Sequence, residues 1–124
     1  MAKILIVDDD ATVVELLSEF LSSKGHEVIS AGDPAKGMQL ARQSAPDLVM
    51  LDYHMPGDTG AHLFEAFRRN RSLQDVPVLF MTGTKPEEDL RSEIASRAHT
   101  AYLRKPVSLD VLEKTVQGLL DKVL

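Results

Sequence analysis

The sequence predicts an α/β fold in which five parallel strands form one sheet with helices on both faces. Two features predict it. Short apolar runs alternate five times with longer amphipathic stretches over 124 residues, and the connections between them are short. A (βα)5 order of this kind builds a doubly wound, flavodoxin-like sheet with strand order 2-1-3-4-5, whose winding reverses between the first and third strands. We expect one domain spanning residues 1–124.

The five expected strands are short runs dominated by apolar residues. The run at 27–31 alternates in part between apolar and polar side chains, whereas the run at 48–51 is apolar throughout. A continuous apolar run is typical of a strand that is covered on both faces. We therefore expect strands at residues 4–7, 27–31, 48–51, 76–81 and 101–103.

The stretches between the strands carry apolar residues at helical spacing, together with residues that begin or end helices. Residues 11–24 form the first expected helix, and Gly25 is suited to stop it. Asp33 and Pro34 are suited to the N-cap and the first position of the second helix. Pro46 ends that helix before the third strand.

The remaining helices follow the same pattern. The third carries Leu63, Phe64 and Phe67 as core residues and closes with arginines that suit the dipole of a helix C-terminus. The fourth opens with a stretch from Lys85, and the fifth is capped by Ser108. The expected inward-facing residues are Leu90, Ile94 and Ala95 in the fourth helix and Leu109, Leu112, Val116 and Leu119 in the fifth.

Composition and charge narrow the class of function. Fourteen basic against nineteen acidic side chains give a net charge of −5. This balance argues against non-specific nucleic-acid binding, which needs a basic face, and against docking on anionic lipid. The chain has no cysteine, which excludes disulfides, thiolate zinc sites and cysteine nucleophiles. No apolar run approaches the roughly 20 residues of a membrane span. We expect a soluble, cytoplasmic domain with no direct nucleic-acid or membrane partner.

Polar side chains follow four of the five expected strands. They are Asp8 and Asp9 after the first strand, Asp52 after the third, Thr82 after the fourth, and Arg104 with Lys105 after the fifth. The carboxyl ends of parallel strands meet at one edge of the sheet, and ligands bind there in the crevice where the strand order reverses. The sequence therefore brings three carboxylates, a hydroxyl and an ammonium to one edge.

Three clustered carboxylates repel one another, at a cost on the order of 4 kcal/mol for a pair about 4 Å apart at an effective dielectric constant near 20. Mg²⁺ removes this repulsion and prefers oxygen ligands. A cation beside a carboxylate, a hydroxyl and an ammonium is typical of a phosphoryl-transfer site. We expect Asp52 to be the nucleophile, forming an acyl phosphate. Lys105 would neutralise the developing charge, and Thr82 would hydrogen-bond a phosphoryl oxygen.

Four motifs cover these strand ends. They are Ile-Leu-Ile-Val-Asp-Asp at 4–9, Leu-Asp-x-x-Met-Pro-Gly-x-x-Gly at 51–60, Met-Thr-Gly at 81–83 and Tyr-Leu-x-Lys-Pro at 102–106. Together they make the chain resemble, from end to end, the receiver domain of the two-component response-regulator family. The resemblance implies a signalling module that takes phosphate from a histidine kinase or a histidine phosphotransfer protein. It also implies a domain that catalyses its own Mg²⁺-dependent phosphorylation and dephosphorylation rather than a turnover enzyme.

The resemblance implies a metal site and a phosphoacceptor. Asp52 is similar to the phosphoacceptor of the family, and Asp9 to its direct Mg²⁺ ligand. Asp8 matches the partner acid that acts largely through water. The backbone carbonyl of His54 would be the third protein ligand, with Mn²⁺ as an alternative ion.

The resemblance also implies residues that contact the phosphoryl group and residues that switch. Thr82, Gly83 and Lys105 match the phosphoryl-contacting positions, and the bond between Lys105 and Pro106 is expected to be cis. Thr82 and Tyr102 resemble the switch pair of the family. In that scheme, Thr82 moves toward the phosphoryl group while Tyr102 rotates inward.

The output surface implied by the resemblance combines the helix from Lys85, the strand at 101–103 and the helix after Ser108. A downstream protein target or output domain would bind there, and a phosphorylation-linked homodimer is an alternative partner. His54 and Thr84 occupy the positions that tune dephosphorylation in the family. The other interpretation of His54 is a surface loop histidine.

Two positions depart from the pattern of the family. Asp58 stands where the family often has methionine, at a place peripheral to the chemistry. Ala98 and His99 stand where the helix before the last strand usually ends in Gly-Ala. Without glycine, a left-handed helix end costs about 1 kcal/mol, so we expect this helix to end differently.

A rival interpretation rests on Asp8-x-Asp10-x-Thr12, which matches the nucleophile motif of haloacid-dehalogenase-type phosphatases. Asp8 would then be the nucleophile and Asp10 the acid or base. That family needs a further acidic motif after the lysine, whereas residues 106–124 carry acids on one expected helix only, and Asp52 would have no role. Asp10 is better interpreted as a helix N-cap. A second alternative is a phosphate-independent protein-interaction module on the same fold.

Overall fold

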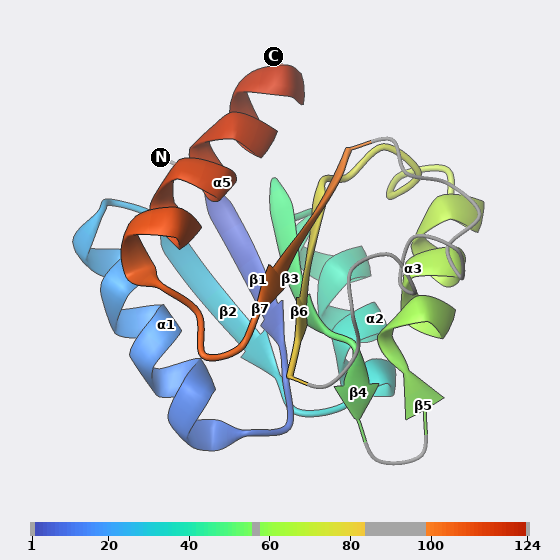
Figure 1. Ribbon diagram of the computed structural model, residues 1–124. Helices are drawn as coiled ribbons and strands as arrows, with labels where there is room; N and C mark the ends of the chain where they lie inside the picture. Colours follow the sequence, from blue (N-terminus) through green and yellow to red (C-terminus); the bar gives the residue numbers. More distant parts are fainter. Residues whose placement is uncertain (1, 56–57, 84–98, 124) are drawn as a thin grey trace.

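The computed structural model describes residues 2–55, 58–83 and 99–123 and contains one five-stranded parallel sheet (Figure 1). Its strands are β1 (Lys3–Val7), β2 (Glu27–Ala31), β3 (Leu48–Asp52), β6 (Val78–Thr82) and β7 (Thr100–Arg104). The strand order is β2-β1-β3-β6-β7, and every neighbouring pair is parallel. Counted along the chain, this is the predicted order 2-1-3-4-5, so the predicted fold class is confirmed.

Helices cover both faces of the sheet. They are α1 (Ala11–Ser23), α2 (Pro34–Ser44), α3 (Gly60–Arg69) and α5 (Leu109–Val123). Figure 1 shows α1 and α5 on one face and α2 and α3 on the other. The fourth helix predicted from Lys85 lies outside the described residues. In the described part of the chain, none of the helices combines the length and apolar character that a bilayer crossing requires.

Alternate residues of the central strands point into two separate cores. Ile4 and Ile6 pack in one apolar cluster with buried residues of α1 and α5. Leu5 and Val7 pack in the other, which includes Phe64 of α3 and Ala41 of α2. This division follows from the two-residue repeat of a strand. It explains why the central strands read as continuous apolar runs, since both faces of the sheet are covered.

The predicted N-caps of the first two helices are confirmed. Asp10 is the N-cap of α1, and its carboxylate accepts hydrogen bonds from the backbone N–H groups of Thr12 and Val13 at 3.0 and 3.3 Å. Asp33 caps α2 in the same way, at 2.8 Å from the backbone nitrogen of Lys36. These carboxylates satisfy N–H groups that have no partner within the helix.

The segment after β3 differs from the prediction. We predicted a loop at 56–60, but Asp58–Thr59 forms β5, which pairs antiparallel with β4 (His54–Met55), and α3 already begins at Gly60. The strand predicted at 76–81 also begins later, at Val78. Pro77 has no N–H to donate to the sheet, although its carbonyl accepts a hydrogen bond from the backbone of Val49 at 2.9 Å.

Of the two positions that depart from the family pattern before the last strand, Ala98 lies outside the described residues and His99 is described. His99 has a φ of 59°, in the left-handed region. A residue with a Cβ pays about 1–2 kcal/mol for this conformation, which glycine adopts freely. The carbonyl of His99 accepts a hydrogen bond from the backbone N–H of Val78 at 2.9 Å. The residue therefore leads directly into β7.

Candidate functional site

Three carboxylates meet where the carboxyl ends of β1 and β3 lie side by side. Asp8 and Asp9 follow β1 directly, and Asp52 is the last residue of β3. The two strands are neighbours in the sheet. One carboxylate oxygen of each residue lies within 4.8 Å of the other two. Asp8 and Asp52 are 2% and 5% exposed, while Asp9 is exposed, so the cluster opens to solvent on one side.

Lys105 brings a positive charge into this cluster. Its Nζ lies 2.9 Å from Oδ2 of Asp8 and 3.5 Å from Oδ1 of Asp52. Burial of the ammonium lowers the pKa of Lys105, but the hydrogen bond to Asp8 and the charges of Asp52 and Asp8 outweigh it, and its pKa is raised overall. The side chain therefore stays charged at neutral pH. The peptide bond between Lys105 and Pro106 is cis.

Thr82 lies at the same edge, at the end of the next strand. It is the last residue of β6 and is 1% exposed. β6 pairs with β3 so that Met81 lies opposite Asp52. The carbonyl of Thr82 accepts a hydrogen bond from the backbone N–H of Lys105 at 2.7 Å. The residue with the hydroxyl and the residue with the ammonium are thus joined through the backbone, and Gly83 follows at an exposed position.

Four other predicted residues are Tyr102, His54, Thr84 and Arg104. Tyr102 is partly buried in β7, where its ring stacks on Phe80. His54 is the first residue of β4, two positions after Asp52. The side chain of His54 and all of Thr84 lie outside the described residues. Arg104 ends β7 and is exposed.

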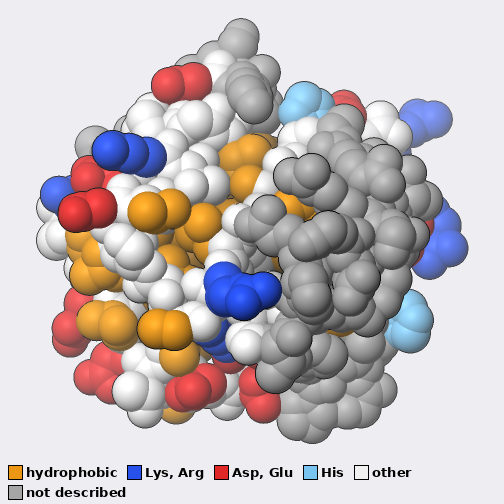
Figure 2. Space-filling view, in the orientation of Figure 1, with side chains coloured by type: hydrophobic (Ala, Val, Ile, Leu, Met, Phe, Trp, Pro, Cys, Tyr) orange, Lys and Arg blue, Asp and Glu red, His pale blue; other side chains and the backbone are white. Residues whose placement is uncertain are grey.

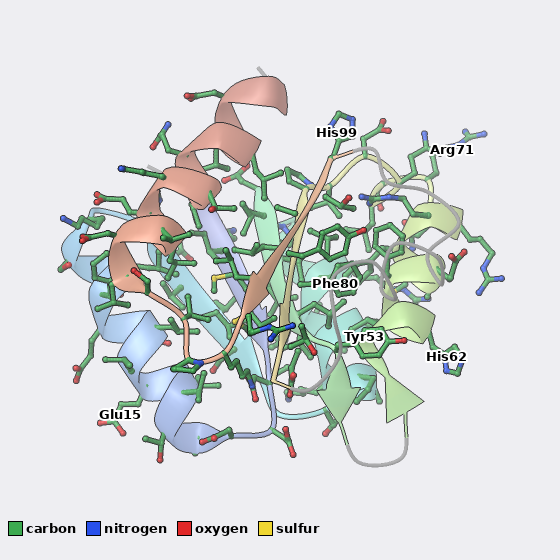
Figure 3. The ribbon with its side chains drawn as sticks, in the orientation of Figure 1. Glu15, Tyr53, His62, Arg71, Phe80 and His99 are labelled. Carbon is green, nitrogen blue, oxygen red and sulfur yellow. The ribbon has the colours of Figure 1, made fainter. Side chains whose placement is uncertain are left out.

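Sequence reasoning missed an aromatic cluster beside the carboxylates. Tyr53, directly after Asp52, is 2% exposed and meets the ring of Phe80 edge-on at 6.4 Å between ring centroids. Figure 3 shows both rings between the sheet and α3. Phe64 of α3 packs on the same Phe80 ring at 5.4 Å. The aromatic residues were visible in the sequence, but their contacts depend on strand register.

A cavity of about 420 Å³ lies at the opposite edge of the sheet. Among its lining residues are Ala2, His26, Asp47 and Pro77, which directly precede β1, β2, β3 and β6. None of the three clustered carboxylates lines it. The amino ends of the strands therefore form this cavity, and the carboxyl ends form the candidate site.

The fold and this edge define a class of protein. It is a doubly wound α/β domain with an acidic crevice at the point where the strand order reverses, which is where such sheets bind their ligands. The chain belongs to the response regulator receiver domain family, whose family model matches residues 4–117. The predicted family and the predicted function, a phosphorylatable receiver domain of two-component signalling, are confirmed. The matched family is one of signalling receivers, not of phosphatases or other turnover enzymes.

Similar proteins cover almost the whole chain. Protein PilH of Pseudomonas aeruginosa is 36% identical over 120 residues, which cover 97% of this chain and 98% of PilH. The DNA-binding dual master transcriptional regulator RpaA of Synechocystis is 37% identical over 120 residues, but the match covers only 49% of RpaA. The chain therefore spans nearly all of PilH and about half of RpaA.

Solved structures confirm the fold. The chemotaxis protein CheY4 of Vibrio cholerae superposes with a TM-score of 0.88 at 31% identity, covering 96% of this chain and 98% of that one. A response regulator from Chloroflexus aurantiacus gives a TM-score of 0.88 at 29% identity, covering 97% and 98%. Each match spans nearly all of both chains, so the fold is shared over almost its whole length.

Proposed function

We propose that this receiver accepts its phosphoryl group on Asp52. The observation that carries the proposal is the position of Lys105, whose Nζ contacts both Asp8 and Asp52 at the mouth of the carboxylate cluster. Asp52 is nearly buried, yet it lies at the edge where ligands of this fold class bind. A carboxylate held beside a fixed ammonium can attack phosphorus while the charge that develops on the phosphoryl oxygens is neutralised.

The transfer step follows from these groups. One carboxylate oxygen of Asp52 forms a bond to the phosphorus of a phosphohistidine, while the bond from phosphorus to the imidazole nitrogen breaks. The leaving nitrogen keeps the electron pair of that bond and takes up a proton. The ammonium of Lys105 forms an ion pair with one phosphoryl oxygen, and the hydroxyl of Thr82 donates a hydrogen bond to another phosphoryl oxygen. The product is an acyl phosphate, which water hydrolyses at the same site.

The carboxylates fit a divalent cation, because their oxygens converge within 4.8 Å and Asp8 is almost fully buried. Hard cations such as Mg²⁺ take oxygen ligands of this kind and keep several waters. Asp9, Asp52 and the backbone carbonyl of His54 would hold the ion, with Asp8 acting largely through water. When bound, Mg²⁺ or Mn²⁺ supplies positive charge to the phosphoryl oxygens. The side chains of His54 and Thr84 are proposed to tune the rate of hydrolysis.

The proposed output surface includes β7 and α5. Tyr102 on β7 is partly buried and lies two residues before Arg104, which pairs with Thr82, the partner of Tyr102 in the proposed switch. Val111 on α5 is 47% exposed, and Figure 2 shows hydrophobic side chains on the side where Figure 1 places α1 and α5. We propose that phosphorylation shifts the population of two conformations of this surface and changes its affinity for a downstream protein or a second copy of this chain. The cytoplasmic location stays a prediction.

The proposal is tested by intact-mass measurement. The protein is incubated with Mg²⁺ and acetyl phosphate, then with a phosphorylated histidine phosphotransfer protein. We expect a gain of one phosphoryl group in the wild type and none in Asp52→Ala. Asp75→Ala is the matched control, because it removes an exposed carboxylate at the opposite edge of the sheet. An unchanged gain in Asp52→Ala would refute the assignment. No gain from either donor would favour a phosphate-independent interaction module.

The switch is tested by binding. Beryllofluoride, which mimics a phosphoryl group on a carboxylate, is added to the protein with Mg²⁺, and sedimentation and partner capture are measured with and without it. We expect a change in self-association or in capture of the downstream protein that Asp52→Ala abolishes. Equal behaviour with and without beryllofluoride would contradict a phosphorylation-dependent output surface.

A further inference from the structure

Phe80 lies at the centre of the aromatic cluster of the receiver. Its side chain is fully buried in the middle of β6. Its ring stacks on the ring of Tyr102 with 5.7 Å between centroids and 12° between planes. The rings of Phe64 and Tyr53 contact it from α3 and from the residue after the phosphoacceptor, at 5.4 and 6.4 Å. All three described ring contacts in this cluster therefore involve Phe80.

Strand register explains why Phe80 has this position. Phe80 is directly opposite Tyr102 in the pairing of β6 with β7. It is also two residues before Thr82, and residues two apart on a strand point to the same face of a sheet. The side chains of Phe80, Thr82 and Tyr102 therefore share one face. Phe80 is the buried neighbour of both residues of the proposed switch pair.

We propose that Phe80 is a positioning residue that holds the Tyr102 ring in its observed place and so sets how readily the receiver changes conformation. This inference rests on the proposed switch role of Tyr102. An offset stack is lost when one ring rotates away from the other, so rotation of Tyr102 away from Phe80 must break this contact. An aliphatic side chain at position 80 would fill space without offering the stacked face.

The size of the effect follows from the strength of aromatic pairs. Losing one such pair changes an equilibrium by about two- to tenfold. Phe80→Leu is expected to raise the population of Tyr102 conformers away from the stack by this factor. In the proposed switch Tyr102 turns inward on phosphorylation, and the observed ring is inward, stacked on buried Phe80 with its hydroxyl oxygen buried. A ligand that favours this inward conformation has an apparent dissociation constant inversely proportional to the population of that conformation. The apparent dissociation constant for beryllofluoride should therefore rise, by at most about two- to tenfold.

The chain allows a direct measurement on Tyr102. It contains two tyrosines and no tryptophan, so a Tyr53→Phe background leaves Tyr102 as the sole tyrosine fluorophore. Time-resolved fluorescence then gives the conformer populations of Tyr102, and titration with beryllofluoride in excess Mg²⁺ gives the apparent dissociation constant. Phe80→Leu and Phe80→Met are compared with Phe67→Leu. Phe67 is equally buried in the same core cluster, whereas the ring that stacks on Tyr102 is that of Phe80.

The outcomes separate a positioning role from a structural one. Melting temperatures should fall in all three variants, because each removes a buried ring. Only the Phe80 variants should change the Tyr102 populations and the beryllofluoride affinity. If Phe67→Leu changes them as much, or if neither Phe80 variant changes the Tyr102 populations, the inference is wrong. If the parent protein shows no Asp52-dependent response to beryllofluoride, the proposed function fails, while the fluorescence of the ligand-free variants still decides the role of Phe80.

Discussion

Replacing Asp52 by Asn should stabilise the protein in the absence of Mg²⁺, even though it removes the proposed phosphoacceptor. Oxygens of the three clustered carboxylates lie within 4.8 Å of one another. At an effective dielectric constant near 20, each such pair repels by about 3 kcal/mol or more. Asp52 therefore takes part in two repulsions, of which the one with exposed Asp9 is weakened by solvent. Within the described residues, the attraction to Lys105 at 3.5 Å opposes these repulsions.

We therefore expect Asp52→Asn to raise the free energy of unfolding by about 1–2 kcal/mol. The loss of attraction is limited because Lys105 keeps its 2.9 Å contact with Asp8 in the variant. For a chain of this length we expect the melting temperature to rise by about 4–8 °C in EDTA. In Mg²⁺ we expect the wild type, and not Asp52→Asn, to have the higher melting temperature. A bound ion stabilises the folded state by about 2.7 kcal/mol at a hundred times its dissociation constant, and the variant lacks one of the ligands.

The assay is calorimetry of the wild type, Asp52→Asn and Glu19→Gln in EDTA and in millimolar Mg²⁺. Glu19 is an exposed acid on α1, so Glu19→Gln removes the same charge away from the cluster. It should leave the melting temperature nearly unchanged in both conditions. An Asp52→Asn variant that melts at or below the wild type in EDTA would show that the carboxylates are not in net repulsion. The electrostatic argument for a cation site would then fail.

Three further outcomes follow from the same structure. Because the folded-state pKa of Lys105 is raised, its ion pairs stabilise the protein below the unfolded pKa of about 10.4 and are lost as the pH rises through the folded value. The wild type should therefore melt above Lys105→Met at neutral pH, and calorimetry should show this difference vanishing in strong alkali. Asp10→Ala should cost about 1 kcal/mol in urea unfolding through loss of the N-cap, yet leave phosphoryl uptake in the mass assay intact; lost uptake would revive the phosphatase interpretation. Phe64→Ala should cost about 3–5 kcal/mol in urea unfolding, and a loss below 1 kcal/mol would contradict its place in the core.

Much of the fold was predictable because it depends on local patterns. Asp10 and Asp33 precede helices in the sequence and cap them in the structure. A short acidic side chain at this position accepts hydrogen bonds from the first backbone N–H groups of the helix. The meeting of Asp8, Asp9 and Asp52 was predictable for a different reason. Parallel strands have their carboxyl ends at one edge, so residues distant in sequence converge once the strand order is known.

The features that were missed depend on non-local geometry. β4 and β5 have two residues each, too few for any periodic pattern to appear. The stack of Phe80 on Tyr102 requires the register of β6 against β7, and a shift of one residue would turn these side chains to opposite faces. The contacts of the Lys105 ammonium with two carboxylates depend on the exact path of the chain after β7. Sequence motifs supply the residue types, whereas these contacts follow from packing.

The contacts at this edge also suggest how phosphorylation of Asp52 could influence the conformation of Tyr102. The side chain of Lys105 forms an ion pair with Asp52, and its backbone N–H donates a hydrogen bond to the carbonyl of Thr82. Phe80 lies two residues before Thr82, and its ring stacks on the ring of Tyr102. A phosphoryl group on Asp52 adds negative charge and acceptor oxygens, so it should draw Lys105 away from Asp8 and attract the hydroxyl of Thr82. Adjacency alone is not coupling. The structure shows the stack between Phe80 and Tyr102 formed. On the proposed switch role of Tyr102, phosphorylation is transmitted through this contact to the extent that it changes the balance between the stacked and the unstacked ring.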